Sequence, residues 1–423
     1  MEYKKFNCNS YTIHTIKTDK FKTVRMEIIF SREAEKEKMP RFTFLADLLT
    51  DASQKYNSRK EMAIALEELY KATFYGVTSK VGNLFTTNFI MEFISPEYVR
   101  EKKYLESVIK FPFDVINHPK VVNREFDITN FNIVKRRLYE EIESIKDSSD
   151  KLAISEALNT MDSTSPSSYK VLGTLDDLNK ITPLNLYDSY EDLFNHSNCD
   201  IFVIGNINMD DCAKIIKNSF KNRVIKLNKP KLYVDNKLRK KVLEKESSKK
   251  FLQSNLVMIY NINKLNDFEK NITFHVLNYI LGGGLTSILY DNLRNKNSLC
   301  YAVRSMYLKQ DGLLIINTLL DKENISKAKK LIIKSILEVV KGKFSIDMLN
   351  DTKKILKMAL NNALDNNASI LNNYEFNVFD NLPLIEERID LIDKVEKEDV
   401  INCAKKIQLN TIYTQVGDLN GRD

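Results

Sequence analysis

Arg294 and Tyr301 are the two residues whose types and spacing best suit them for chemistry. They lie seven positions apart in the run LGGGLTSILYDNLRNKNSLCYAV, residues 281–303. The apolar pattern predicts a helix around residues 288–294, a short loop and a strand from about residue 300, so both side chains flank a loop. Because a guanidinium is always charged and a phenol donates one hydrogen bond, the pair could hold and polarise a peptide carbonyl. Taken alone, the pattern also fits a surface arginine and a half-buried core tyrosine.

Three consecutive glycines, Gly282, Gly283 and Gly284, precede this pair. Glycine permits a close approach of the backbone to a substrate strand, and it also ends helices, so both interpretations stay open. Other chemistries find no support in the sequence. LGGGLT lacks the lysine and hydroxyl of a phosphate loop, FVIGNIN has too few glycines for a dinucleotide fingerprint, and there is no GxSxG motif.

Length and composition indicate a globular protein of two or more domains, with 423 residues of which 43% are hydrophobic. The net charge of +7 arises from 64 basic and 57 acidic residues, which is too dilute for a dedicated nucleic-acid surface. The five cysteines are odd in number and lack CxxC spacing, so we expect buried free thiols. The start MEYKKFNCNS lacks the apolar stretch of a targeting segment, so we expect a cytoplasmic location.

Residues 271–290 are long enough and free enough of charge to be considered as a membrane span. They also contain His275, Asn278 and the three glycines, which fit a buried helix running into a tight turn better than a span. We therefore expect no membrane partner.

The order of elements in the first half recurs in the second half, which predicts two copies of one domain. A strand at 23–30 followed by an apolar helix at 42–50 matches a strand at 254–262 followed by a helix at 272–281. Each copy continues with an alternating strand, an amphipathic helix, a long polar helix and a closing strand. These later pairs are 84–95 with 312–321, YLESVIKF with AKKLIIKSILEVV, 131–147 with 346–364, and 200–207 with 411–419.

Residues 222–250 are highly charged and without periodicity, so we interpret them as a solvated linker between domains at 1–221 and 251–423. An alternative is a basic segment that contacts RNA. That alternative is weak because the segment holds one aromatic residue, Tyr233, and no stacking pattern. We expect no nucleic-acid partner.

The duplicated half, the basic linker and the LGGG...LR...LCYAV unit together resemble the pitrilysin/insulinase metallopeptidases, or inverzincins, over nearly the whole chain. The resemblance implies an α+β fold of two tandem homologous domains, each a mixed sheet packed with helices as in mitochondrial processing peptidase, forming a clamshell around peptides. In this family the second half supplies an arginine and, seven positions on, a tyrosine. Arg294 and Tyr301, with Gly282, Gly283 and Gly284, match this pattern and are the implied substrate-binding residues.

The zinc motif of the family, HxxEH, is degenerate in this chain. Aligned through FLADLLTDASQKYNSRKEMAIALEEL, the two histidine positions hold Thr43 and Asp47, and the general-base position holds Ala46. The third ligand position matches Glu141, with Glu140 as the neighbouring possibility. Zinc in such a site needs two imidazoles and a carboxylate, and alanine cannot accept a proton from a bound water. We expect this chain to bind no metal and to contribute no catalytic residue of its own.

A zinc site rebuilt elsewhere is unsupported, because the four histidines are mutually distant in sequence and none has a second histidine three to five residues away: His14, His118, His196 and His275. The resemblance is closest to a short bacterial branch of non-catalytic members that lack HxxEH. It implies a non-catalytic, substrate-polarising subunit of a heterodimeric zinc metallopeptidase acting on peptides, with zinc and general base supplied by a homologous partner. Two alternatives remain, a peptide-binding or scaffolding protein and an autonomous zinc peptidase with unusual ligands.

Overall fold

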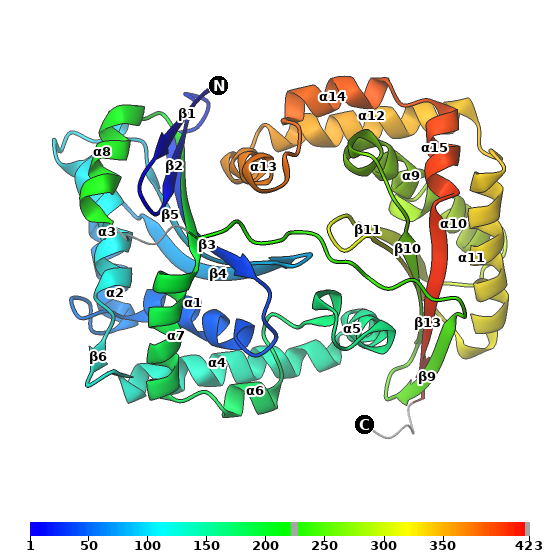
Figure 1. Cartoon of the computed structure of the whole chain (residues 1–423), viewed down its shortest axis with the longest axis horizontal. Helices are drawn as coiled ribbons and strands as arrows, with labels where there is room; N and C mark the ends of the chain where they lie inside the picture. Colours follow the sequence, from blue (N-terminus) through cyan, green and yellow to red (C-terminus); the bar gives the residue numbers. More distant parts are fainter. Residues whose placement is uncertain (221–226, 419–423) are drawn as a thin grey trace. The chain divides into compact units, whose positions relative to one another are not determined.

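The computed structural model describes residues 1–220 and 227–418, which form two compact units (Figure 1). Unit 1 comprises Met1–Glu143, Lys170–Leu232 and Asn366–Glu375. Unit 2 comprises Ser144–Tyr169 and the other described residues from Tyr233 onward. The predicted domain boundary between residues 221 and 222 lies outside the described residues.

Unit 1 is built on a six-stranded mixed sheet with the order β1-β2-β8-β3-β5-β4. Its central strand β3 is buried along nearly its whole length, as expected of a strand covered on both faces. Helices α1, α3, α7 and α8 pack against the sheet. The strands are β1 Glu2–Asn7, β2 Thr12–Lys17, β3 Thr23–Glu33, β4 Thr73–Val81, β5 Leu84–Ile94 and β8 Asn198–Gly205, and the helices are α1 Met39–Asp51, α2 Arg59–Glu68, α3 Tyr104–Asn117, α4 Ile128–Asp147, α6 Leu175–Asn179, α7 Pro183–His196 and α8 Met209–Ser219.

Unit 2 is built on a five-stranded sheet with the order β11-β12-β10-β13-β9. Between β10 and β11 the chain forms a helical stretch, Glu269–Asn295, in which π-helical turns alternate with short α-helices. The strands are β9 Leu243–Lys249, β10 Ser254–Ile262, β11 Ala302–Leu308, β12 Leu313–Leu320 and β13 Ile407–Gly417, and the longer helices are α5 Ser149–Met161, α11 Ile325–Val340, α12 Ile346–Ala363, α13 Asn367–Asp380, α14 Ile385–Asp393 and α15 Lys397–Ala404.

The two sheets have the same topology, which confirms the predicted α+β fold of two homologous domains. Followed from β2 to β4, unit 1 has the order β2-β8-β3-β5-β4, and unit 2 followed from β9 to β11 matches it strand for strand. In both units the first pair is parallel and the other three pairs are antiparallel. Among the described strands of the six-stranded sheet, only β1 has no counterpart in the five-stranded sheet.

The structure differs from the sequence prediction at Leu243–Lys249, which lies in the segment expected to be a solvated linker. These residues form β9, the counterpart of β2, and pair in parallel with β13. The strand has no apolar alternation because it lies at the sheet edge, where backbone hydrogen bonds to one neighbour hold it in place.

Each unit also incorporates a segment from the other half of the sequence. Ala153 and Ala157 of α5 pack against Val257 and Ile259 of β10 in the core of unit 2. Residues 366–375, which include the first part of α13, belong to unit 1. The two compact units therefore do not coincide with the two halves of the sequence.

The helical stretch Glu269–Asn295 is long and apolar enough to cross a membrane by length and composition alone. In its most apolar 18-residue segment, 61% is buried inside the structure. Ile272, Phe274, Val276 and Leu277 belong to the hydrophobic core of unit 2, so the apolar character of the stretch has a use in packing.

Candidate functional site

The structure brings Arg294 and Tyr301 together at the entrance to β11. The Ser287 side chain accepts a hydrogen bond from the Tyr290 N–H and so starts the short helix Ile288–Tyr290, which continues as a π-helical turn to Asn295. Arg294 lies in that turn and is exposed. Its Nη1 donates a hydrogen bond to the backbone carbonyl of Tyr301 at 2.7 Å, and its guanidinium carbon lies 5.3 Å from the centre of the Tyr290 ring. One N–H group of the Arg294 guanidinium is thus used to fix the backbone where β11 begins.

The hydroxyl of Tyr301 donates to the carboxylate of Asp321, with oxygen distances of 3.0 and 3.2 Å. This hydrogen bond and the negative charge of Asp321 raise the pKa of Tyr301, and the side chain of Gln253 opposes that rise. The tyrosine is 49% exposed. Sequence reasoning missed Asp321, although the aspartate directly follows β12, the hairpin partner of β11, and the paired ends of a hairpin lie side by side.

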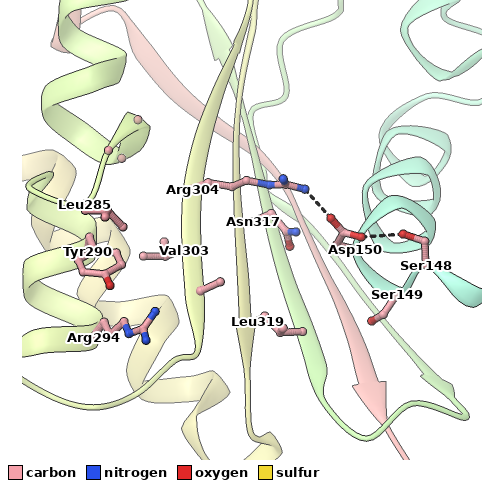
Figure 2. Close-up of a pocket in the computed structure, with 14 residues that line it drawn as sticks. Ser148, Ser149, Asp150, Leu285, Tyr290, Arg294, Val303, Arg304, Asn317 and Leu319 are labelled. Atoms are coloured by element: carbon pink, nitrogen blue, oxygen red, sulfur yellow. Dashed lines mark hydrogen bonds and ion pairs between the residues drawn. The ribbon is translucent and has the colours of Figure 1, made fainter. Parts of the chain in front are cut away.

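A groove of about 690 Å³ lies beside Arg294 within unit 2. Figure 2 shows Arg294 beside Tyr290, and Arg304 and Asp150 pointing toward one another. Arg304 Nη2 lies 2.6 Å from Asp150 Oδ2, and the Ser148 hydroxyl donates to Asp150 at 2.8 Å. The groove is lined by Ser148, Ser149, Asp150, Gly282, Gly283, Gly284, Leu285, Tyr290, Arg294, Ala302, Val303, Arg304, Asn317 and Leu319, so Tyr301 is not part of its wall.

Gly282 and Gly284 lie in the groove wall, where an added Cβ atom would require neighbouring side chains to shift. A Cβ atom on Gly282 would lie 2.9 Å from Leu289 Cδ1 and Ser305 Oγ, and one on Gly284 would lie 2.8 Å from the Tyr279 hydroxyl oxygen. Both residues have negative φ angles, so a preference for glycine here comes from close packing and not from a left-handed turn. Contact of these glycines with a substrate remains a prediction.

Asn317 is a groove residue that the sequence did not single out. It lies opposite Arg304 in the β11–β12 pairing and is only 5% exposed. Within the described chain its Oδ1 has no hydrogen-bond partner. A buried amide oxygen without a partner is costly.

In unit 1, the predicted zinc-motif positions Thr43, Ala46 and Asp47 lie on α1 and Glu141 lies on α4, and the first two serve packing. Thr43 is buried, and its Oγ1 lies 3.0 Å from Met39 O, 3.1 Å from Val171 O and 2.9 Å from Thr78 Oγ1. Ala46 is buried against β4, where a Cβ on Gly76 would lie 2.2 Å from Ala46 O.

The fold does bring Asp47 and Glu141 close to one another, among cations that the chain itself supplies. Burial raises the pKa of Asp47, the negative charges of Glu141 and Asp51 raise it further, and Arg137 and Arg59 lower it. Arg137 Nη2 donates to Asp51 Oδ1 at 3.1 Å. In the part of the chain that the structure describes, no three His, Cys, Asp or Glu side chains form a group suited to a metal ion. The residues at the motif do not fit zinc.

Comparison with known proteins supports the resemblance to the inverzincin family. Residues 180–356 match the family described as "Peptidase M16 inactive domain". The chain is 24% identical over 406 residues, 95% of each chain, to "Probable inactive metalloprotease YmfF" of Bacillus subtilis. It is 22% identical over 325 residues, 74% of this chain and 77% of the relative, to "Uncharacterized zinc protease YmxG" of the same strain.

Solved structures show the same fold. A conserved protein from Enterococcus faecalis superposes with a TM-score of 0.92 and 24% identity, covering 99% of this chain and 100% of that one. A "peptidase M16 inactive domain" from Pseudomonas fluorescens superposes with a TM-score of 0.79 and 17% identity, covering 100% of both chains. The predicted resemblance to the inverzincins is confirmed.

Proposed function

We propose that this inactive M16-type metalloprotease-like protein is the substrate-binding subunit of a heterodimeric peptidase whose homologous partner carries the zinc and the general base. The observation that carries the proposal is that the zinc-binding half of an M16 active centre is degenerate in this chain, whereas the arginine and tyrosine of the other half are retained. At the motif of unit 1, Thr43 and Ala46 are packing residues. In unit 2, Arg294 and Tyr301 remain exposed, and Arg294 lines a groove.

In the proposed complex, Arg294 donates to the carbonyl of the bound peptide. Only its Nη1 is engaged in a hydrogen bond within the described chain, with Tyr301 O, so further guanidinium N–H groups are available to a ligand. Charge that develops on the carbonyl oxygen would be stabilised by this fixed cation. The partner would be a zinc-bearing homologue, and we place the pair in the cytoplasm. The Bacillus strain with a relative named as inactive also has one named as a zinc protease, in line with such a pair.

Reconstitution tests this proposal. The chain and a zinc-bearing homologue from the same organism are purified and mixed, and cleavage of a fluorogenic peptide library is followed for each protein alone and for the mixture. We expect activity that depends on both proteins. Arg294→Ala in the mixture should lower kcat by about 10²- to 10³-fold, as loss of one oxyanion donor does.

Lys296→Ala is the matched control. Lys296 is a cation two residues away that is 63% exposed and pairs with Asp291, so its removal should leave turnover unchanged. Arg294→Lys keeps the charge but loses the planar fork and should recover only part of the rate. An Arg294→Ala mixture as fast as wild type would refute the role of this arginine.

A second candidate function is peptide binding without hydrolysis. It is favoured by the groove itself and by β11, which is an edge strand of its sheet and pairs only with β12 among the described strands. An extended peptide can add to such an edge through main-chain hydrogen bonds. Peptide binding by the isolated chain, together with no stimulation of any zinc-bearing homologue, would select this function.

A further inference from the structure

The hairpin turn between β11 and β12 is buried although its residues are polar. The paired strands end at Leu308 and begin again at Leu313. Between them, Lys309, Gln310 and Asp311 are 8%, 7% and 8% exposed. Hairpin turns usually lie at the surface, because a buried turn must find partners for its polar groups elsewhere in the chain. In this turn the partners come from three other segments of unit 2.

Asp380, the last residue of α13, is the shared acceptor on one side of the turn. Its Oδ2 lies 2.5 Å from Lys309 Nζ and accepts a hydrogen bond from Gln310 Nε2 at 3.0 Å. Its Oδ1 accepts a hydrogen bond from the Tyr233 hydroxyl at 2.6 Å. The side chains of Lys309 and Asp380 are only 7% and 3% exposed, so each buried charge depends on the other.

Two further segments bind the other side of the turn. The Ser167 hydroxyl donates to Asp311 Oδ1 at 2.6 Å. Asn236 Nδ2 donates to the backbone oxygen of Asp311 and to Ser167 Oγ, both at 2.8 Å. The Val234 N–H donates to the backbone oxygen of Gln310 at 2.9 Å. Hydrogen bonds thus join four separate segments of the chain at one turn.

The residues of this network form what we name the polar clamp: Ser167, Tyr233, Val234, Asn236, Lys309, Gln310, Asp311 and Asp380. The chain passes between the two units at 143/144, 169/170, 232/233, 365/366 and 375/376. Ser167 lies just before the second of these points, Tyr233 directly follows the third, and Asp380 lies shortly after the fifth. The polar clamp therefore fixes three connecting segments to one turn of unit 2.

We propose that the polar clamp is a conformational device that holds these three connecting segments together on unit 2 and so limits the movement of one unit relative to the other. Because Asp380 is the acceptor for both Tyr233 and Lys309, loss of its charge should loosen the segment after residue 232 and the end of α13 at the same time. Buried hydrogen bonds around one ion pair break together, since each partner left behind is a costly unpaired group.

Hydrogen exchange at the Val234 amide reports the state of the polar clamp, because its N–H is bonded to Gln310. Asp380→Asn keeps the shape of the side chain and removes its charge. It should accelerate exchange at Val234 by about tenfold or more. The amides of β10, in the middle of the sheet, report unfolding of unit 2 as a whole and should change much less. A Val234 rate that is unchanged, or that rises only as much as those of β10, would overturn the proposal.

Asp393→Asn is the matched control. Asp393 lies 2.7 Å from Lys357 in unit 2, and its side chain is 57% exposed. Because exposed ion pairs contribute little, this variant should leave the Val234 exchange rate unchanged.

Tyr233→Phe provides a milder variant in case Asp380→Asn does not fold. It removes one hydroxyl and leaves the Lys309–Asp380 pair in place. Loss of this hydrogen bond should accelerate exchange by about fivefold, both at Val234 and at the amides of residues 376–380. Acceleration in only one of these two segments would show that they are not held together.

The distance between the units is the second readout. Spin labels are attached at Glu67→Cys in α2 and Lys334→Cys in α11, two exposed positions, in a Cys8→Ser background because Cys8 is the native cysteine that is not buried. The distance distribution should be broader in Asp380→Asn than in wild type and in Asp393→Asn. Equal widths in all three, even with faster Val234 exchange, would mean that the polar clamp only stabilises unit 2 and would overturn its role in limiting movement.

Discussion

Arg137 donates a hydrogen bond to the buried carboxylate of Asp51, one helical turn beyond the second histidine position of the degenerate zinc motif. Asp51 is 5% exposed, so its charge needs a nearby cation. In this chain a guanidinium provides that cation.

Removal of Arg137 should therefore be costly. Arg137→Ala leaves Asp51 as a buried charge without its cation and should lower the free energy of unfolding by about 3 kcal/mol, measured by chemical denaturation. Arg136→Ala is the matched control, because Arg136 is exposed on the same helix and should change stability by less than about 0.5 kcal/mol. Equal effects of the two variants would show that the Arg137–Asp51 ion pair contributes no more to stability than an exposed arginine does.

Zinc should be neither retained nor needed by the isolated chain. Thr43 is a poor zinc ligand, and Arg137 and Arg59 oppose binding of a further cation beside Asp47. We expect elemental analysis after mild dialysis to find well under one zinc per chain. We also expect chelators to leave the denaturation midpoint unchanged. One tightly held zinc per chain, lost together with stability on chelation, would instead indicate an autonomous peptidase.

Glu375 should make the stability of unit 1 depend on pH. Burial raises the pKa of Glu375, the negative charges of Glu27 and Asp200 add to the rise, and Arg25 opposes it. Stability that depends on protonated Glu375 is complete below the ordinary glutamate pKa of about 4.3 and is lost as pH rises through the folded-state pKa. Glu375→Gln stays neutral, so it should be more stable than wild type at pH 8 and equal to it near pH 4.

Thermal denaturation of both proteins across this pH range measures the effect as a difference, which cancels groups that titrate alike. Glu386→Gln, at an exposed position on α14, should show the wild-type pH profile. A constant difference between Glu375→Gln and wild type at all pH values would contradict the prediction.

Asp150 should weaken the binding of acidic peptides in the groove. Its carboxylate lies 2.6 Å from the guanidinium of Arg304, so one of the two groove arginines is neutralised. Asp150→Asn frees that charge and should tighten binding of an acidic peptide by about two- to fivefold, since exposed pairs are weak. The gain should disappear at high salt. Asp147→Asn makes the same charge change outside the groove and should alter affinity little.

The sequence alone determined most of the helices and strands, and it showed which residues of the zinc motif are missing. Periodicities of two and three and a half residues report which face of an element is buried, and the duplicated order of those patterns predicted two copies of one domain. The residue types at 43, 46 and 47 predict the loss of a family-type zinc site, because none of them is an imidazole or a general base in the required place. The Arg294–Tyr301 contact was also within reach, because seven residues and one loop separate its partners.

The tertiary structure decided how residues distant in sequence were brought together. Strand β9 was missed because an edge strand is held by its backbone, which leaves no pattern in side-chain polarity. Asp321 meets Tyr301 through the β11–β12 register, and Arg137 meets Asp51 through the packing of α4 beside α1. Local periodicity reports which face is buried, whereas only the register of sheets and the packing of helices determine which residue a buried or exposed group faces.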